Sequence, residues 1–122
     1  MQEKELLEIW PNPERVNIKE VEENGCWVTE TEYFYRDGMY SFIISEGIVC
    51  RLSVDSGGKY CTYSSEQGLF SMIGIYPLDT PQRSETVDTI TFTSVNHMID
   101  KVVFEGVDKE KQLVTKFTVF FK

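Results

Sequence analysis

The sequence has few of the residues on which most catalytic and metal centres are built. It contains one histidine, His97, and three cysteines, Cys26, Cys50 and Cys61. An odd number of cysteines disfavours a disulfide framework, and no Cys-x-x-Cys or His-x-x-x-His motif supplies the spacing of a zinc site. We therefore expect reduced, mostly buried thiols and no bound metal.

Long hydrophobic runs and positive charge are also scarce. The longest uncharged apolar stretch, Leu69 to Leu78, is far shorter than the ~20 residues that cross a bilayer. The acidic N-terminus lacks the regions of a signal peptide, which predicts a cytoplasmic protein. Because 12 basic residues face 20 acidic ones, a net charge of −8, we expect neither nucleic-acid binding nor membrane docking. Such acidity suits a basic protein partner, or serves only to keep the protein soluble.

Motifs for catalysis are absent as well. No Gly-x-Ser-x-Gly elbow occurs, and His97 lies in an expected surface turn, so its pairing with a nucleophile and with Asp88 or Asp100 is disfavoured. Ser56-Gly57-Gly58 falls in an expected hairpin turn and not before a helix, which argues against a phosphate loop. A pair of carboxylates for glycoside hydrolysis stays open, because it depends on spatial separation. The sequence thus favours a non-catalytic protein without a cofactor.

What the sequence does have is alternating polarity, turn signals and aromatic residues, which make up 13% of the chain. It predicts one β domain over 1–122, with a helix over 1–10 and an antiparallel sheet over 15–122. Leu6, Leu7 and Trp10 share one face of the helix, which we expect to pack on the sheet.

Two turn signals set the expected pairing of the first strands. Asn24-Gly25 and Asp37-Gly38 predict two-residue hairpin turns, whose central positions need positive φ. The expected core side, which we call the aromatic face, consists of Trp27, Thr29, Thr31, Tyr33, Tyr35, Tyr40, Phe42 and Ile44. At the next turn, hydrophobic matching favours a three-residue loop over a two-residue turn at Glu46-Gly47. That loop spans 45–47 and adds four residues to the aromatic face, namely Ile48, Cys50, Leu52 and Val54.

The later strands are expected at 59–65, 69–76, 87–95, 99–107 and 113–121, with the longest loop at 77–85. Counted from Cys26 this makes eight strands with short links. Such a layout favours an up-and-down barrel or a clam-like pair of sheets, since closure removes exposed edges.

This layout resembles the calycins, the lipocalin and fatty-acid-binding-protein class. Gly25-Cys26-Trp27 is similar to the lipocalin Gly-x-Trp at the start of the first barrel strand, and a short helix precedes it as in that family. The Thr-Asp-Tyr element and the closing arginine of lipocalins are not found, so the resemblance is one of architecture alone. It implies a small barrel.

Two groups of acidic and aromatic residues are candidate contact surfaces. The first hairpin places Glu22 opposite Trp27 and Glu20 opposite Thr29. On the opposite face of the sheet Glu30 and Glu32 flank Phe34. Carboxylates beside aromatic rings suit an interface with a basic partner, and the alternative is a solvated face partly covered by the helix. The candidate partner-binding residues are Glu20, Glu22, Trp27, Glu30, Glu32 and Phe34.

The function that these observations favour is that of an inhibitor, of the immunity-protein or antitoxin kind. Such a protein would occlude the active site of a basic partner, such as a nuclease toxin, with carboxylates where phosphates would lie. The alternative is a small intracellular β-barrel carrier with an apolar ligand in its interior.

Overall fold

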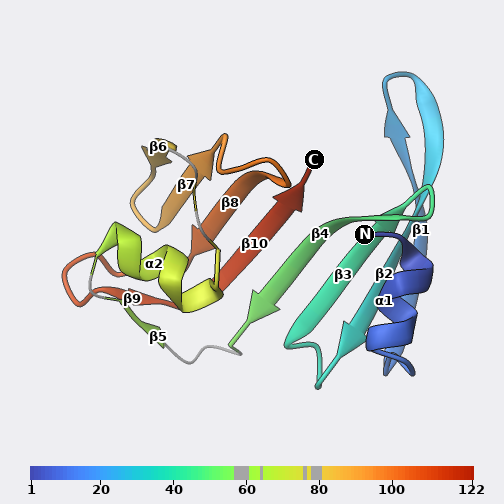
Figure 1. Ribbon diagram of the computed structural model, residues 1–122, viewed down its shortest axis with the longest axis horizontal. Helices are drawn as coiled ribbons and strands as arrows, with labels where there is room; N and C mark the ends of the chain where they lie inside the picture. Colours follow the sequence, from blue (N-terminus) through green and yellow to red (C-terminus); the bar gives the residue numbers. More distant parts are fainter. Residues whose placement is uncertain (57–60, 64, 76, 78–80) are drawn as a thin grey trace. The chain divides into compact units, whose positions relative to one another are not determined.

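The computed structural model describes residues 1–56, 61–63, 65–75, 77 and 81–122 and is mainly β (Figure 1). Its eight main strands form an open antiparallel sheet, preceded by a short helix. The expected antiparallel fold is confirmed, but the sheet is not a closed barrel. β1 (Arg15–Glu23) and β6 (Gln82–Glu85) each pair on one side only. Both end strands carry charged side chains, which limit non-specific pairing at an open edge but leave its backbone groups accessible.

The chain divides into two compact units, Met1–Ser53 and Val54–Lys122. The first unit holds β1, β2 (Cys26–Tyr35), β3 (Tyr40–Ser45) and the start of β4 (Ile48–Asp55), which lie in chain order in the sheet.

The helix of the first unit, α1 (Glu3–Ile9), packs on the aromatic face, as its sequence predicts. Leu6 is buried, and Leu7 is half-buried. The Trp10 ring, at the end of the helix, meets Tyr35, Tyr40 and Phe42 edge-on, with centroids 5.1, 5.3 and 5.6 Å away. Aromatic edge-to-face contacts of this kind add to burial and fix the helix on the sheet.

The first two hairpins have the predicted registers. Asn24 and Gly25 both have positive φ, and Glu22 pairs with Trp27. At the second turn Asp37 and Gly38 have positive φ, and Tyr35 pairs with Tyr40. Here a third residue, Arg36, also has positive φ. The ladder therefore ends at the pair Tyr35–Tyr40, one pair earlier than in a hairpin with a two-residue loop.

The prediction for the third turn is wrong. Only Glu46 and Gly47 separate β3 from β4, and both have positive φ, as a two-residue type I′ turn requires. The side chains at the start of β4 therefore lie on the opposite faces from those expected. Ile48 is 52% exposed, whereas Val49 is 3% exposed. The two-residue turn forms although Glu46 must adopt a left-handed backbone, which few residues other than Gly, Asn and Asp favour, so hydrophobic matching did not decide the register.

The second unit contains the strand order β10 (Lys116–Phe121), β8 (Ile99–Glu105), β7 (Thr89–Thr93) and β6. Two short strands, β5 (Cys61–Thr62) and β9 (Leu113–Val114), form a separate pair. The expected strands at 87–95, 99–107 and 113–121 are confirmed as β7, β8 and the β9–β10 segment. The core consists of Leu69, Phe70, Ile90, Phe92, Val95, Val102, Phe104, Val107, Val114 and Val119, among others.

The expected strand at 69–76 is wrong, because residues 69–73 belong to α2 (Glu66–Ile73), while residue 76 lies outside the described residues. Ser65 caps the helix by accepting a hydrogen bond from the Gly68 amide, and Gly74 ends it in the left-handed conformation. Leu69 and Phe70 face the core, where the Phe70 and Phe92 rings lie 4.7 Å apart.

Two neighbouring expectations are met only in part. Of the strand expected at 59–65, residues 61–63 and 65 are described, and only Cys61–Thr62 forms a strand. Residues 59, 60 and 64 lie outside the described residues, as do Gly57 and Gly58 of the expected turn. The loop expected over 77–85 ends earlier, because Gln82–Glu85 pairs with β7.

Candidate functional site

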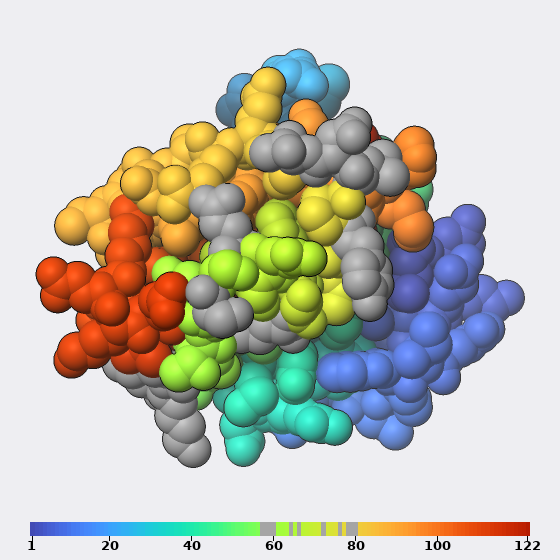
Figure 2. All heavy atoms as spheres, turned by 60° about the vertical axis from the view of Figure 1, so that its left-hand side comes forward, coloured from blue at the N-terminus to red at the C-terminus, as the bar shows by residue number. Residues whose placement is uncertain are grey.

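The first hairpin extends past its neighbour in the sheet. The last pair between β2 and β3 is Glu30 with Ser45, so residues 26–29 of β2 pair with β1 alone. We call residues 20–29 the hairpin arm. It is the light-blue loop that extends beyond β3 in Figure 1, and atoms of its tip lie at the surface in Figure 2.

The hairpin arm is acidic and carries an exposed indole. Its three carboxylates, Glu20, Glu22 and Glu23, are accompanied by no Lys or Arg. The β1–β2 register puts Glu20 and Glu22 on the same face as Trp27, which is 69% exposed. Within the described part of the chain no cation pairs with Glu20 or Glu22. The expectation that Trp27 and Thr29 face the core is wrong, because β3 and α1 end before they reach them.

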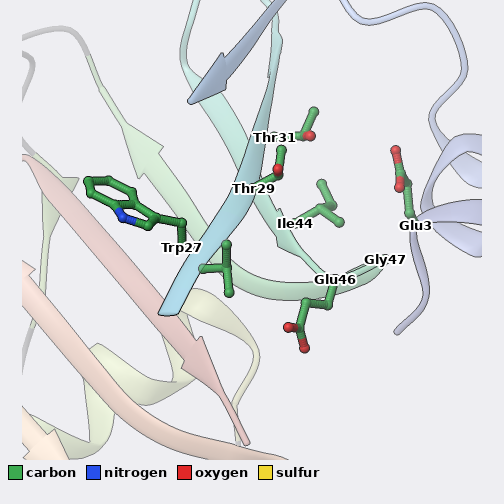
Figure 3. Close-up of a pocket in the computed structure, with 8 residues that line it drawn as sticks. Glu3, Trp27, Thr29, Thr31, Ile44, Glu46 and Gly47 are labelled. Carbon is green, nitrogen blue, oxygen red and sulfur yellow. The ribbon is translucent and has the colours of Figure 1, made fainter. Parts of the chain in front are cut away.

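A hollow of about 360 Å³ lies beside the hairpin arm on the aromatic face. Figure 3 shows Trp27 on one side of it, Glu3 on the other and Ile44 between them, with Glu46 at its lower edge. Glu3 comes from α1 and Glu46 from the β3–β4 turn. The residues that line the hollow are Glu3, Trp27, Val28, Thr29, Thr31, Ile44, Glu46 and Gly47. The sequence did not point to Glu3 or Glu46, because the two lie more than 40 positions apart in the chain.

One hydrogen bond fixes Glu3 at the edge of this hollow. The Tyr33 hydroxyl donates to Glu3 Oε1. This bond, together with burial, raises the pKa of Tyr33 from 10.0 to about 12. The bond ties the first turn of α1 to the sheet and keeps a carboxylate beside the hollow.

The other face of the same strands is also charged, but it carries cations beside its carboxylates. Lys19 Nζ lies 4.0 Å and Arg51 Nη2 lies 3.2 Å from the Glu30 carboxylate, whose side chain is only 15% exposed. The guanidinium of Arg15 stacks over the Phe34 ring, 4.0 Å from its centroid. This face therefore has little unbalanced negative charge to offer a partner.

Glu32 lies on this face of mixed charge, beside a small pocket of about 80 Å³. The pocket is lined by Asn17, Lys19, Glu30, Glu32 and Ile43. The contacts of α1 are with the aromatic face, so the idea that the helix covers Glu30, Glu32 and Phe34 is wrong. The six candidate residues thus divide between Glu20, Glu22 and Trp27 on the hairpin arm and Glu30, Glu32 and Phe34 on the opposite face, where Glu30 and Phe34 contact cations.

The histidine and the three cysteines are spread over the chain, and only Cys26 belongs to the hairpin arm. His97 is exposed in a bend. Cys26 and Cys61 are exposed, and Cys50 is half-buried, which corrects the expectation of mostly buried thiols. Burial raises the pKa of the Cys50 thiol, which donates to the Ile43 carbonyl at 3.2 Å and is a poor nucleophile in the protonated form.

Metal-ligating clusters and membrane-crossing helices are both missing from the described residues. Within them, no group of three or more His, Cys, Asp or Glu side chains is arranged to hold a metal ion. None of their helices combines the length and the hydropathy that a membrane crossing demands.

No protein-family model, curated protein or solved structure matches this chain. The calycin-like layout expected from the sequence is therefore confirmed only as far as the antiparallel sheet and the short helix, and no family is identified.

Proposed function

We propose that this protein is a non-catalytic inhibitor, of the immunity-protein kind, whose hairpin arm binds a basic protein partner such as a nuclease toxin. The observation that carries the proposal is the exposed Trp27 indole with the unpaired carboxylates of Glu20 and Glu22 on the same face. The hollow beside it extends the acidic surface to Glu3 and Glu46.

Electrostatics and chemistry both favour a cationic partner at this place. Unpaired carboxylates on one small surface accelerate the encounter with a positively charged protein. An exposed indole binds Lys and Arg side chains through cation–π contacts, which strengthen when the pair is desolvated. Trp is also among the residues that contribute most to binding energy at protein interfaces.

The proposed inhibition follows from the same charges. The catalytic groove of a nuclease binds phosphates with Lys and Arg side chains. Carboxylates from the hairpin arm would occupy those cations and exclude the nucleic acid. Glu30, Glu32 and Phe34 would then support the base of the hairpin arm, since Lys19 and Arg51 already pair with Glu30 and Arg15 covers Phe34. The barrel carrier has no comparable support, because the sheet is open.

The experiment compares two charge-reversed variants. The immobilised protein, the variant E20K/E22K and the control D100K/E110K are incubated with lysate of the native cell at low salt, and recovered basic proteins are identified and assayed for nuclease activity. Asp100 and Glu110 are exposed residues of the second unit, and both variants change the net charge equally. We expect the wild type and the control to recover and inhibit one basic protein, and E20K/E22K to bind it about tenfold more weakly or worse. Equal recovery by all three, or recovery of no basic protein, would contradict the proposal.

A further inference from the structure

The outer edge of β1 is an unpaired strand edge within the described sheet. β1 is the end strand of its sheet and pairs with β2 only. Eight of its nine residues are exposed, including the apolar side chains of Val16 and Ile18. A long exposed edge of this kind offers its backbone N–H and C=O groups to another strand.

The register determines which backbone groups point outward. In a two-residue hairpin the residues that flank the turn, here Glu23 and Cys26, form a hydrogen-bonded pair, and such pairs alternate along the ladder. The odd-numbered residues of β1 therefore bond to β2. The even-numbered residues direct their N–H and C=O groups to the open edge, and these are Val16, Ile18, Glu20 and Glu22.

The same four residues place their side chains on the aromatic face, next to Trp27. A strand added in antiparallel direction would pair with them residue by residue. Its own side chains on that face would meet Glu22 first, then Glu20, then Ile18 and Val16. The complementary sequence, read from its N-terminus, is basic–x–basic–x–apolar–x–apolar.

A second copy of the chain does not fit this pattern. Two β1 edges in a continuous antiparallel ladder must pair even residues with even residues. In every such register, Glu20 or Glu22 of one copy lies opposite an apolar residue or a carboxylate of the other copy. The register that pairs Arg15 with Glu23 also places the two Lys19 residues opposite each other. Charge complementarity therefore selects a different, basic partner.

We infer that the edge of β1 binds an extended, basic segment of a protein partner as an additional antiparallel strand. This inference rests on the proposed function, since it specifies how the basic partner binds. Backbone hydrogen bonds to the even-numbered residues hold the segment, and Glu20 and Glu22 select its two basic side chains.

The probe for this inference is the end-capped peptide Lys-Thr-Lys-Thr-Val-Thr-Val. Binding is measured by calorimetry, and amide hydrogen exchange of the protein is followed by NMR. We expect binding to slow exchange at Val16, Ile18, Glu20 and Glu22, whose amides have no partner in the β1–β2 ladder. The peptide Glu-Thr-Glu-Thr-Val-Thr-Val should bind about tenfold more weakly or worse, because like charges then oppose Glu20 and Glu22.

Two matched comparisons test the backbone bonds themselves. N-methylation of the second Lys and the first Val of the peptide should weaken binding about tenfold, whereas N-methylation of two Thr amides, which point away from β1, should not. In the protein, Ile18→Pro removes one outward N–H and leaves the β1–β2 bonds intact, so it should stay folded and lose affinity.

The outcomes separate this inference from the proposed function. If the peptide binds without protecting the even-numbered amides, or if both methylated peptides bind equally, strand addition is refuted while a basic partner remains supported. Absence of peptide binding also refutes strand addition. The proposed function is decided independently by the recovery of a basic protein with E20K/E22K and its control.

Discussion

The bond between Tyr33 and Glu3 offers the sharpest quantitative test of the structure. Tyr33→Phe removes the hydroxyl that donates to Glu3 and keeps the ring that packs under α1. A hydrogen bond to a charged acceptor contributes about 1.5–3 kcal/mol, and this one lies near solvent beside the hollow. We expect the free energy of unfolding to fall by about 1 kcal/mol at neutral pH.

The dependence on pH distinguishes this bond from simple packing. The pKa of Tyr33 is raised from 10.0 to about 12 in the folded protein. A group whose folded pKa is raised stabilises the protein fully below its unfolded pKa. The stabilisation is therefore complete below pH 10.0 and is lost as the pH rises toward about 12. Two pKa units correspond to about 2.7 kcal/mol, an upper limit that screening by solvent reduces.

The assay is urea denaturation of the wild type and the variant from pH 7 to 11.5. Because the wild type and the variant share every other ionisable group, only the difference between the two free energies of unfolding is interpreted. We expect this difference to be constant up to about pH 10 and then to shrink toward zero. Glu3→Gln serves as the control, since it keeps an acceptor and removes the charge. It should lower the folded pKa of Tyr33, so that the decline still begins near pH 10.0 but is smaller and ends at a lower pH than in the wild type. A difference that stays constant across the whole range would refute the reasoning.

Three further predictions follow from single positions. Gly106→Ala should reduce the free energy of unfolding by more than about 2 kcal/mol, and Gly74→Ala by about 1 kcal/mol, as measured in thermal or urea melts. Both glycines have positive φ, but only at Gly106 would the new Cβ collide with Thr115. Equal losses would show that the collision with Thr115 is not the cause. Trp27→Ala should change the free energy of unfolding by less than about 0.5 kcal/mol, because the side chain is 69% exposed. It should weaken binding of the proposed basic partner about tenfold or more. A large loss of stability would mean that the indole is part of the core. Glu30→Gln should cost about 1 kcal/mol at low salt and less at 1 M salt, because it removes the partly buried carboxylate that Lys19 and Arg51 contact. A cost independent of salt would show that the charges do not matter.

The parts of the fold that the sequence predicts are those fixed by local chemistry. Asn24-Gly25 and Asp37-Gly38 need left-handed backbone and so determine the registers of the first two hairpins. These registers in turn place Glu20, Glu22 and Trp27 on one face. The pairing of Lys19 with Glu30 follows from the same register and was within reach of the sequence.

The parts that the sequence does not predict depend on competition between signals. The apolar run that begins at Leu69 suits a buried strand or a helix equally, and periodicity does not separate the two over so short a length. The decisive signals were the caps, Ser65 before the run and Gly74 after it. At Glu46-Gly47 the hydrophobic matching was misleading, since the residues it sought to bury, Leu52 and Val54, are only half-buried.

The exposure of Trp27 depends on where other elements end, which no local pattern encodes. Its place on the aromatic face suggested burial, but β3 stops opposite Glu30 and leaves the indole without a neighbour on that side. Likewise Arg51 reaches Glu30 from a strand that does not adjoin β2. Long side chains that bridge two strands are a property of the assembled sheet.

The distribution of charge argues against solubility as the only role of the acidic residues. A surface adapted for solubility intersperses charges of both signs, and the base of the first hairpin does so: Lys19 and Arg51 neutralise Glu30, and Arg15 covers Phe34. The hairpin arm does not, since its three carboxylates have no cation within residues 20–29. Like charges on a two-stranded ribbon repel one another and destabilise it. An exposed indole adds no solubility either. A cationic surface that covered the hairpin arm would make both features favourable, and for that reason we propose the binding role for the hairpin arm and not for the opposite face.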